Sequence, residues 1–300
     1  MGFPKDIGVI DLLLGIPSGP EAYSGAGARR AKERWRPLLR DADSIQGLEM
    51  PAGYMFKDLP RAGEQKDYVA WTVQEMDRFG IERAMIRIDD DDDLAKEAHR
   101  RFPDRFFHWY EADAHRGMDE VRKIVRLHEE FGIVAVGGLP AAHNPQLPIN
   151  DARWYPIYAK CVELDIAFCC NVGVPGPRVP FACQKVELID EVCWFFPELR
   201  FVMRHGGDPW TELATKLMLK WPNLYYMTSA FAPKHYPQEI IDFANTRGSD
   251  KILYAGYFPF GLTLDRIFDE LERVPFRDHV WPKFLRENAL RVFHLPDTKA

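Results

Sequence analysis

Residues 165–171 read Asp-Ile-Ala-Phe-Cys-Cys-Asn, and this stretch decides the fold because five apolar residues follow one another between two polar ends. Such a continuous apolar run is typical of a parallel strand that helices cover on both faces. The segment before it carries the helical period, since Trp154, Ile157, Tyr158 and Cys161 share one stripe. We therefore predict a helix that leads into a buried parallel strand.

The same unit recurs along the chain. Eight short apolar segments alternate with amphipathic helices, and glycine or proline marks the ends of several of these helices. This pattern predicts the α/β class and a closed (β/α)8 TIM barrel, in one domain over residues 1–300. A doubly wound open sheet is the alternative, but no glycine-rich nucleotide loop follows the first strand. The predicted strands are 7–13, 82–88, 105–111, 133–139, 165–171, 199–205, 223–228 and 251–258.

Residues 15–64 do not follow this alternation of strands and helices. They separate the first strand from the first clear helix and are rich in glycine, proline and arginine, with an amphipathic piece near residues 31–39. The insertion leaves the first strand at its carboxyl end, which is the face where barrels build their sites. We predict a lid over the barrel mouth or a dimer arm, and a tolerated surface insertion is the alternative.

Composition excludes several classes of partner. The net charge is −6, and no cluster of Lys and Arg suggests nucleic acid as the main partner. No apolar stretch reaches the roughly 18 residues that a membrane span needs, so we expect no membrane partner. The five cysteines are odd in number and lack Cys-x-x-Cys spacing, which is typical of reduced thiols in a cytoplasmic protein.

Five segments of the later chain carry a family resemblance: 148–158, 204–210, 228–234, 250–254 and 287–293. In order and spacing they resemble the amidohydrolase-related family, which includes aminocarboxymuconate-semialdehyde decarboxylase, aromatic-acid decarboxylases and lactone hydrolases. The resemblance implies a distorted (β/α)8 barrel, in agreement with the strand count.

The resemblance also implies a site for one divalent metal ion, commonly zinc. In the family, an Asp-x-His-x-His on strand one and a His ending strand five hold the metal. A His ending strand six acts as a base, and an Asp ending strand eight binds metal or moves a proton. This chain has Leu13 and Gly15 at the strand-one positions, then Asn171 and Tyr257 at the strand-five and strand-eight positions. Because these side chains are poor ligands or none, we expect no metal ion and no other cofactor.

A rebuilt metal site is the alternative, in which His205 would act with His143, His108 or Glu111. Of the four histidine positions and the strand-eight aspartate position of the family, only that of His205 keeps its residue, and His205 is a candidate catalytic acid or base. Tyr257 is a second catalytic candidate, because a phenol can donate a hydrogen bond to an oxyanion. Asn171 is a candidate substrate contact, and the alternative is that both fill the emptied ligand space.

The remaining site candidates are weaker. Asp208 is a catalytic candidate beside His205, although a carboxylate before a proline commonly caps a helix. Arg204 could bind a substrate carboxylate, but strand alternation directs it away from His205 at first reading. Glu111, at the end of the third strand, is a third substrate-binding candidate. We interpret the acidic run 89–93 as a solvated loop that also caps the next helix.

Two functions fit these residues. The first is a metal-independent hydrolase or decarboxylase-like carbon–carbon lyase that acts on a small carboxylated or aromatic-derived substrate. The second is an inactive paralogue that binds a ligand or supports an active partner in a hetero-oligomer. A homodimer or such a hetero-oligomer is the expected assembly, and the fold alone cannot choose between the two functions.

Overall fold

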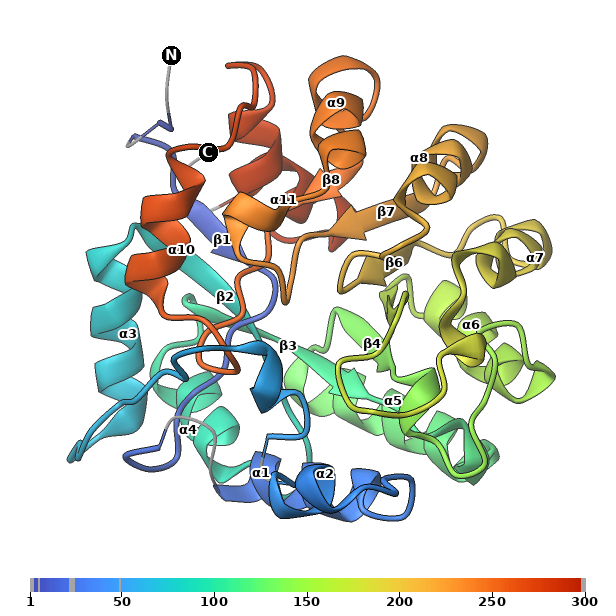
Figure 1. The fold of residues 1–300 in the computed structure, drawn as a ribbon, viewed down its shortest axis with the longest axis horizontal. Helices are drawn as coiled ribbons and strands as arrows, with labels where there is room; N and C mark the ends of the chain where they lie inside the picture. The colour runs from blue at the N-terminus through green and yellow to red at the C-terminus, as the bar shows by residue number, and fades with distance from the viewer. Residues whose placement is uncertain (1–2, 5, 22–24, 49, 298–300) are drawn as a thin grey trace.

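Eight parallel strands form one sheet in a computed structural model that describes residues 3–4, 6–21, 25–48 and 50–297 (Figure 1). Each strand is hydrogen-bonded to the next one in the chain, from β1 to β8. A doubly wound sheet reverses its strand order, so this consecutive order confirms the predicted barrel. The strands are β1 Val9–Asp11, β2 Ile81–Arg87, β3 Phe106–Glu111, β4 Ala135–Gly138, β5 Ala167–Asn171, β6 Phe201–Arg204, β7 Leu224–Met227 and β8 Ile252–Leu253.

A ring of helices surrounds the strands (Figure 1). Helices α3 to α10 each follow one strand, α1 and α2 belong to the insertion after β1, and α11 packs against the core inside the barrel through Ala289 and Val292. Gly132 ends α5 in a left-handed conformation with φ 61°, as its position before an apolar strand predicted. The helices are α1 Gly25–Trp35, α2 Ala42–Gln46, α3 Tyr68–Arg78, α4 Asp93–Arg101, α5 Met118–Phe131, α6 Tyr155–Glu163, α7 Ile189–Phe195, α8 Thr211–Lys220, α9 Gln238–Thr246, α10 Leu264–Leu271 and α11 Asn288–Val292.

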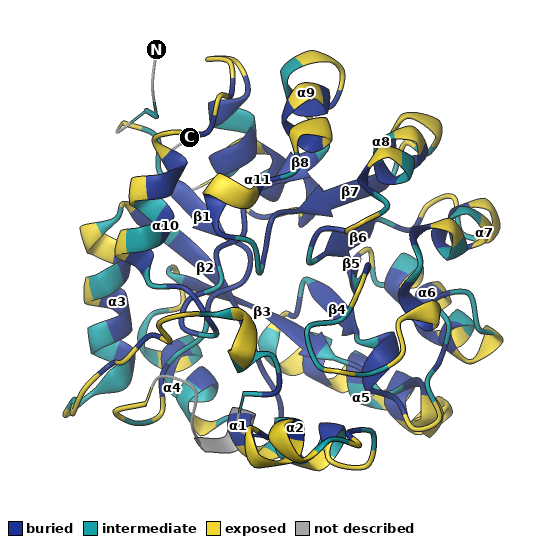
Figure 2. Ribbon diagram, viewed as in Figure 1, coloured by how far each residue is buried: buried dark blue, intermediate teal, exposed yellow. Residues whose placement is uncertain are grey.

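Two large apolar cores hold the barrel itself together, and a third, smaller cluster joins the insertion to the loops after β4 and β5. Of the two large cores, one lies inside the barrel and includes Ile10, Met85, Trp109 and Val202, while the other lies between strands and helices. The strands are therefore buried along most of their length, and the helices expose their outer faces (Figure 2). Burial on both faces explains why the strands read as continuous apolar runs. In the part of the chain that the structure describes, no helix is long and apolar enough to span a membrane.

The seam between the first and last strands depends on a buried carboxylate. Asp11 Oδ1 accepts hydrogen bonds from the backbone N–H groups of Leu13 and Gly256, each at 2.9 Å. The Leu12 N–H donates to the Tyr254 carbonyl across the same seam at 3.4 Å. Strand β8 is only two residues long, so the predicted strand 251–258 was too long. The Asp11 side chain thus takes over part of the pairing that a longer β8 would provide.

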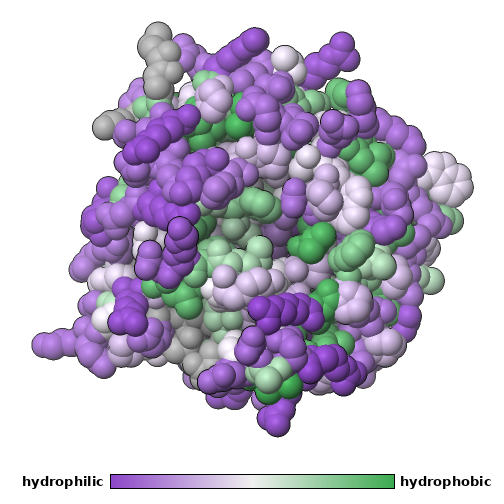
Figure 3. Space-filling view, in the orientation of Figure 1, coloured by the Kyte–Doolittle hydropathy of each residue, from purple (hydrophilic) through white to green (hydrophobic). Residues whose placement is uncertain are grey.

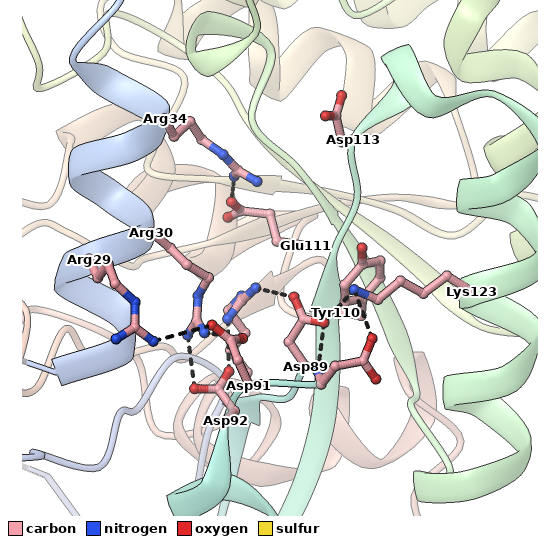
Figure 4. Close-up of polar contacts among 12 residues, drawn as sticks. Arg29, Arg30, Arg34, Asp89, Asp91, Asp92, Tyr110, Glu111, Asp113 and Lys123 are labelled. Atoms are coloured by element: carbon pink, nitrogen blue, oxygen red, sulfur yellow. Dashed lines mark hydrogen bonds and ion pairs between the residues drawn. The ribbon is translucent and has the colours of Figure 1, made fainter.

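The insertion is fastened to the barrel by ion pairs. Figure 4 shows three arginines that extend from α1 toward acidic residues at the ends of β2 and β3. Arg30 pairs with Asp91 and with Asp92, the latter at 2.8 Å. The acidic run is therefore not simply a solvated loop, and the Asp92 side chain makes no capping hydrogen bond to α4. Residues 22–24 and 49 of the predicted 15–64 insertion lie outside the described residues.

Burial raises the pKa of Asp11 from 3.8 to about 6. A raised folded-state pKa means that protonation stabilises the fold, and that this contribution is lost as pH rises through 6. Asp11→Asn keeps an oxygen acceptor for both N–H groups but cannot ionise. Between about pH 4 and pH 7, the free energy of unfolding of the wild type should therefore fall by about 3 kcal/mol more than that of Asp11→Asn. The figure follows from a shift of about two pKa units at about 1.4 kcal/mol per unit.

Urea unfolding at several pH values measures this difference. Glu198→Gln is the matched control, because it removes a carboxylate from an exposed position. Equal pH dependence in the wild type and the Asp11→Asn variant would contradict the role given to Asp11.

Candidate active site at the barrel mouth

The carboxyl ends of three strands bring Glu111, Asn171 and Arg204 together. The Arg204 side chain is buried, with the residue only 3% exposed, and its Nε donates a hydrogen bond to Asn171 Oδ1. Its Nη2 lies 3.5 Å from Glu111 Oε2. All three predicted substrate-binding residues therefore meet at one place, which is the face where barrel enzymes bind their ligands.

The expected orientation of Arg204 was wrong. Val202 points into the barrel, so Arg204, two residues later on the same strand, points inward as well. Strand β6 ends at Arg204, and His205 already has a left-handed backbone with φ 65°. Because the chain turns at His205, the arginine and the histidine can both serve the mouth.

An indole ring supports the arginine from inside the barrel. The Arg204 guanidinium carbon lies 4.6 Å from the centre of the Trp109 ring, which is a cation–π contact. Gly137 on β4 leaves room for this pair: a Cβ there would overlap the Trp109 ring and lie 3.4 Å from Arg204 Nη1. Glycine is required at this position by close packing, and it keeps the guanidinium plane in place.

His205 is held on one side by Ser229. Its Nδ1 lies 2.9 Å from Ser229 Oγ, and its backbone N–H donates to the same oxygen at 3.2 Å. Nδ1 is thus engaged, which leaves Nε2 as the ring nitrogen available to a substrate. Burial, with the nearby Arg204 charge, lowers the pKa of His205 to about 3, so the ring is neutral near pH 7.

Tyr257 lies against His205, with ring centroids 5.5 Å apart in an edge-on arrangement. The ring of Phe56, in the insertion, stacks on Tyr257 at 5.7 Å, and the ring of Phe260 lies 5.6 Å from it. Burial raises the pKa of Tyr257 to about 12, although the Arg204 charge opposes this shift. The phenol is therefore a neutral hydrogen-bond donor at ordinary pH.

One predicted residue, Asp208, departs from its expected role, and one residue of the site, Arg34, was not predicted. Asp208 is exposed, and the helix after it begins at Thr211 with Trp210 as its N-cap, so the expected capping role was wrong. Among the described residues, no hydrogen bond or ion pair joins its carboxylate to His205. Arg34 was missed altogether: it extends from α1 and pairs with Glu111 Oε1 (Figure 4). The arginine-rich composition of the insertion was the only sequence signal for this contact.

The histidines proposed for a rebuilt metal site lie elsewhere. His108 is on the helix-facing side of β3, where its Nε2 is 2.9 Å from His99 Nδ1. His143 lies in the loop after β4 with Nε2 3.3 Å from Asp113 Oδ1. Within the described ranges, no three His, Cys, Asp or Glu side chains are grouped as a metal ion would require.

The strand-one positions do not fit a metal ligand either. Leu13 is buried and has no donor atom. A Cβ on Gly15 would lie only 2.7 Å from the Phe260 ring, so a histidine there would have to displace that ring. Leu13 and Gly15 therefore supply no ligating side chain at the two strand-one positions.

A parallel eight-stranded barrel with ionisable side chains at the carboxyl ends of its strands is the architecture of the TIM-barrel enzymes. A family model described as Amidohydrolase matches residues 35–295. The chain belongs to this amidohydrolase family, which confirms the resemblance found in its sequence.

Several known proteins are similar to this chain. The 2-keto-4-carboxy-3-hexenedioate hydratase of Sphingobium sp. is 29% identical over 111 residues, which is 32% of this chain and 32% of the hydratase. The chain thus matches about a third of the length of that curated relative.

The similar solved structures extend over nearly the whole chain. An uncharacterized TIM-barrel protein from Bordetella bronchiseptica has a TM-score of 0.69 at 21% identity, covering 96% of this chain and 99% of that one. The 5-carboxyvanillate decarboxylase of Sphingomonas paucimobilis has a TM-score of 0.68 at 13% identity, covering 97% and 100%. The dihydroxybenzoic acid decarboxylase of Polaromonas sp., solved with bound manganese and 2-nitroresorcinol, has a TM-score of 0.66 at 18% identity, covering 98% of each chain. At these identities the likeness shows the fold.

The low pKa of His205 gives a direct test of the site. We expect its ring C2 proton resonance to stay constant between about pH 5 and pH 8, whereas an ordinary histidine titrates near 6.5. Proton NMR measures this, and the signal is assigned by its loss in His205→Asn. Arg204→Met should raise the midpoint, because it removes one of the two causes of the shift. A wild-type midpoint near 6.5 would show that the ring is neither buried nor close to the guanidinium.

Proposed function

We propose that this protein is a metal-independent hydrolase or decarboxylase-like lyase that acts on a small carboxylated or aromatic-derived substrate. The observation that carries the proposal is the meeting of Arg204, Asn171, His205 and Tyr257 at the barrel mouth. An anion-binding group, a proton-transfer group and a neutral donor are the parts that such chemistry needs.

Each residue has a role in this proposal. Arg204 binds the substrate carboxylate, and Asn171 fixes the guanidinium from the Nε side. His205 moves a proton through Nε2, while Ser229 holds the ring by Nδ1. Tyr257 donates a hydrogen bond to the anion that develops. Glu111 orients Arg204 from the Nη side.

A bound carboxylate would also help His205. The Arg204 charge lowers the pKa of the ring, so a substrate anion that offsets this charge raises that pKa toward neutrality. Proton transfer is most efficient when the pKa of the group lies near the working pH. His205 is thus weakly basic unless an anion binds beside Arg204.

The family supports the substrate class. Relatives of similar fold include decarboxylases of 5-carboxyvanillate and of dihydroxybenzoic acid, which are small aromatic carboxylates. In the space-filling view, the centre of the face shown carries apolar and weakly polar side chains, surrounded by hydrophilic ones (Figure 3). A ligand with an apolar body and one anionic end fits such a surface.

The insertion acts as a lid in this proposal. Phe56 stacks on Tyr257, and Arg34 reaches Glu111, so both ends of the site are in contact with residues of the 15–64 segment. A segment with these contacts excludes water from the mouth when it is closed.

Metal independence predicts the composition of the purified protein. We expect no stoichiometric zinc or manganese, because the strand-one positions supply no ligand and a guanidinium repels a divalent cation. Elemental analysis measures this, with the manganese-binding Polaromonas decarboxylase prepared in parallel as a positive control. About one tightly bound transition metal per chain would contradict the proposal.

Substitution of the proton-transfer group tests the activity itself. His205→Asn keeps a hydrogen-bonding side chain of similar size, so the fold should survive while turnover falls roughly 100-fold or more. Tyr257→Phe should reduce turnover by a smaller factor than His205→Asn, because it removes one donor to the developing anion. Single-turnover kinetics on a panel of aromatic and unsaturated carboxylic acids measures both effects.

The control for these variants is His279→Asn, which changes a histidine at an exposed position. A His205→Asn protein that folds and turns over at the wild-type rate would refute the catalytic assignment. The barrel would then be a binding subunit, as in the alternative function.

A further inference from the structure

The Arg204 guanidinium lies among the positions that hold the metal in the family. It is hydrogen-bonded to Asn171, which stands at the strand-five ligand position. It is also close enough to Tyr257, at the strand-eight position, for its charge to oppose the rise that burial causes in the pKa of that phenol. A positive charge is thus present between two family ligand positions.

The surroundings of this charge compensate it only in part. The hydrogen-bond partner at Nε is a neutral amide, and the ring beneath the guanidinium is a neutral indole. Its one ion pair among the described residues is the 3.5 Å contact with Glu111, and Glu111 is shared with Arg34. A buried charge with such incomplete pairing is costly unless it serves an anion.

The geometry also fixes the direction in which an anion can approach. Asn171 occupies the Nε side, and Trp109 covers one face of the guanidinium plane. On the Nη side, Nη2 lies 3.5 Å from Glu111 Oε2, and no hydrogen bond joins Nη1 to another of the described residues. The N–H groups of Nη1 are therefore the donors that can bind a planar carboxylate. Lysine could not hold this orientation, because its ammonium group is not planar and does not stack.

We infer that the Arg204 guanidinium takes over the place and charge of the family's metal ion and binds the carboxylate of a small aromatic or unsaturated acid. The inference rests on the substrate class of the proposed function. It adds that the electrostatic stabilisation of the anion comes from a fixed side chain, held by Asn171 and Trp109, instead of a divalent cation.

Binding of benzoate and salicylate tests this without any turnover. Titration calorimetry on the full chain, after treatment with a chelator, should show saturable binding. Arg204→Met keeps most of the apolar stem but removes the charge, so affinity should fall at least about 10-fold, the loss typical of one charge-assisted hydrogen bond. Arg204→Lys should give an intermediate affinity, and Arg122→Met, at an exposed position on α5, is the matched control.

Chemical rescue adds a second readout. Guanidinium at low millimolar concentration should restore benzoate binding to Arg204→Ala, because the ion can occupy the space between Trp109 and Asn171. It should leave the Arg122→Met control unchanged. Circular dichroism establishes that each variant is folded.

Three outcomes would overturn the inference. One is wild-type affinity in Arg204→Met, and another is a dependence of benzoate binding on added zinc or manganese. The third is the absence of binding of both acids to the wild type. Failure of the proposed function is distinguishable, because acids that bind through Arg204 but are never turned over leave this inference intact and remove only the catalytic role of His205.

Discussion

The whole barrel depends on one constraint, which is that its first and last strands must join although the last is only two residues long. A buried carboxylate meets this constraint, since Asp11 accepts backbone hydrogen bonds from both sides of the seam. The mouth is built on this closure: Leu13 and Gly15 follow β1, and Tyr257 and Phe260 follow β8. If the seam opened, Phe260 would leave Gly15, and Tyr257 would leave His205.

The barrel was predictable from the sequence because its strands are buried on both faces and its helices are not. The run 165–171 shows this contrast most clearly, and the strand that it predicts is present as Ala167–Asn171. The positions of Glu111, Asn171 and Tyr257 at the mouth were also predictable, because parallel strands bring their carboxyl ends to one face. Predicting the positions of these residues required only that the ends of their strands be located correctly in the sequence.

Other parts of the site depend on contacts that no local pattern encodes. Arg204 points inward because it follows Val202 by two residues on β6, and His205 can face the mouth as well only because β6 ends before it. Arg34 reaches Glu111 from a helix in the insertion, far away along the chain. The platform of Trp109 under Arg204 exists only because Gly137 on the next strand leaves room for it. Long-range packing decides all three.

The seam has a further consequence for how the protein is made. Asp11 and its partner Gly256 are separated by 245 positions in the chain. At typical synthesis rates of about 5–20 residues per second, roughly 10 to 50 s pass between them on the ribosome. Throughout that interval β1 has no neighbour on one side, and its unpaired edge is open to other strands. Nascent chains of this protein should therefore depend on chaperones until their last quarter has been translated.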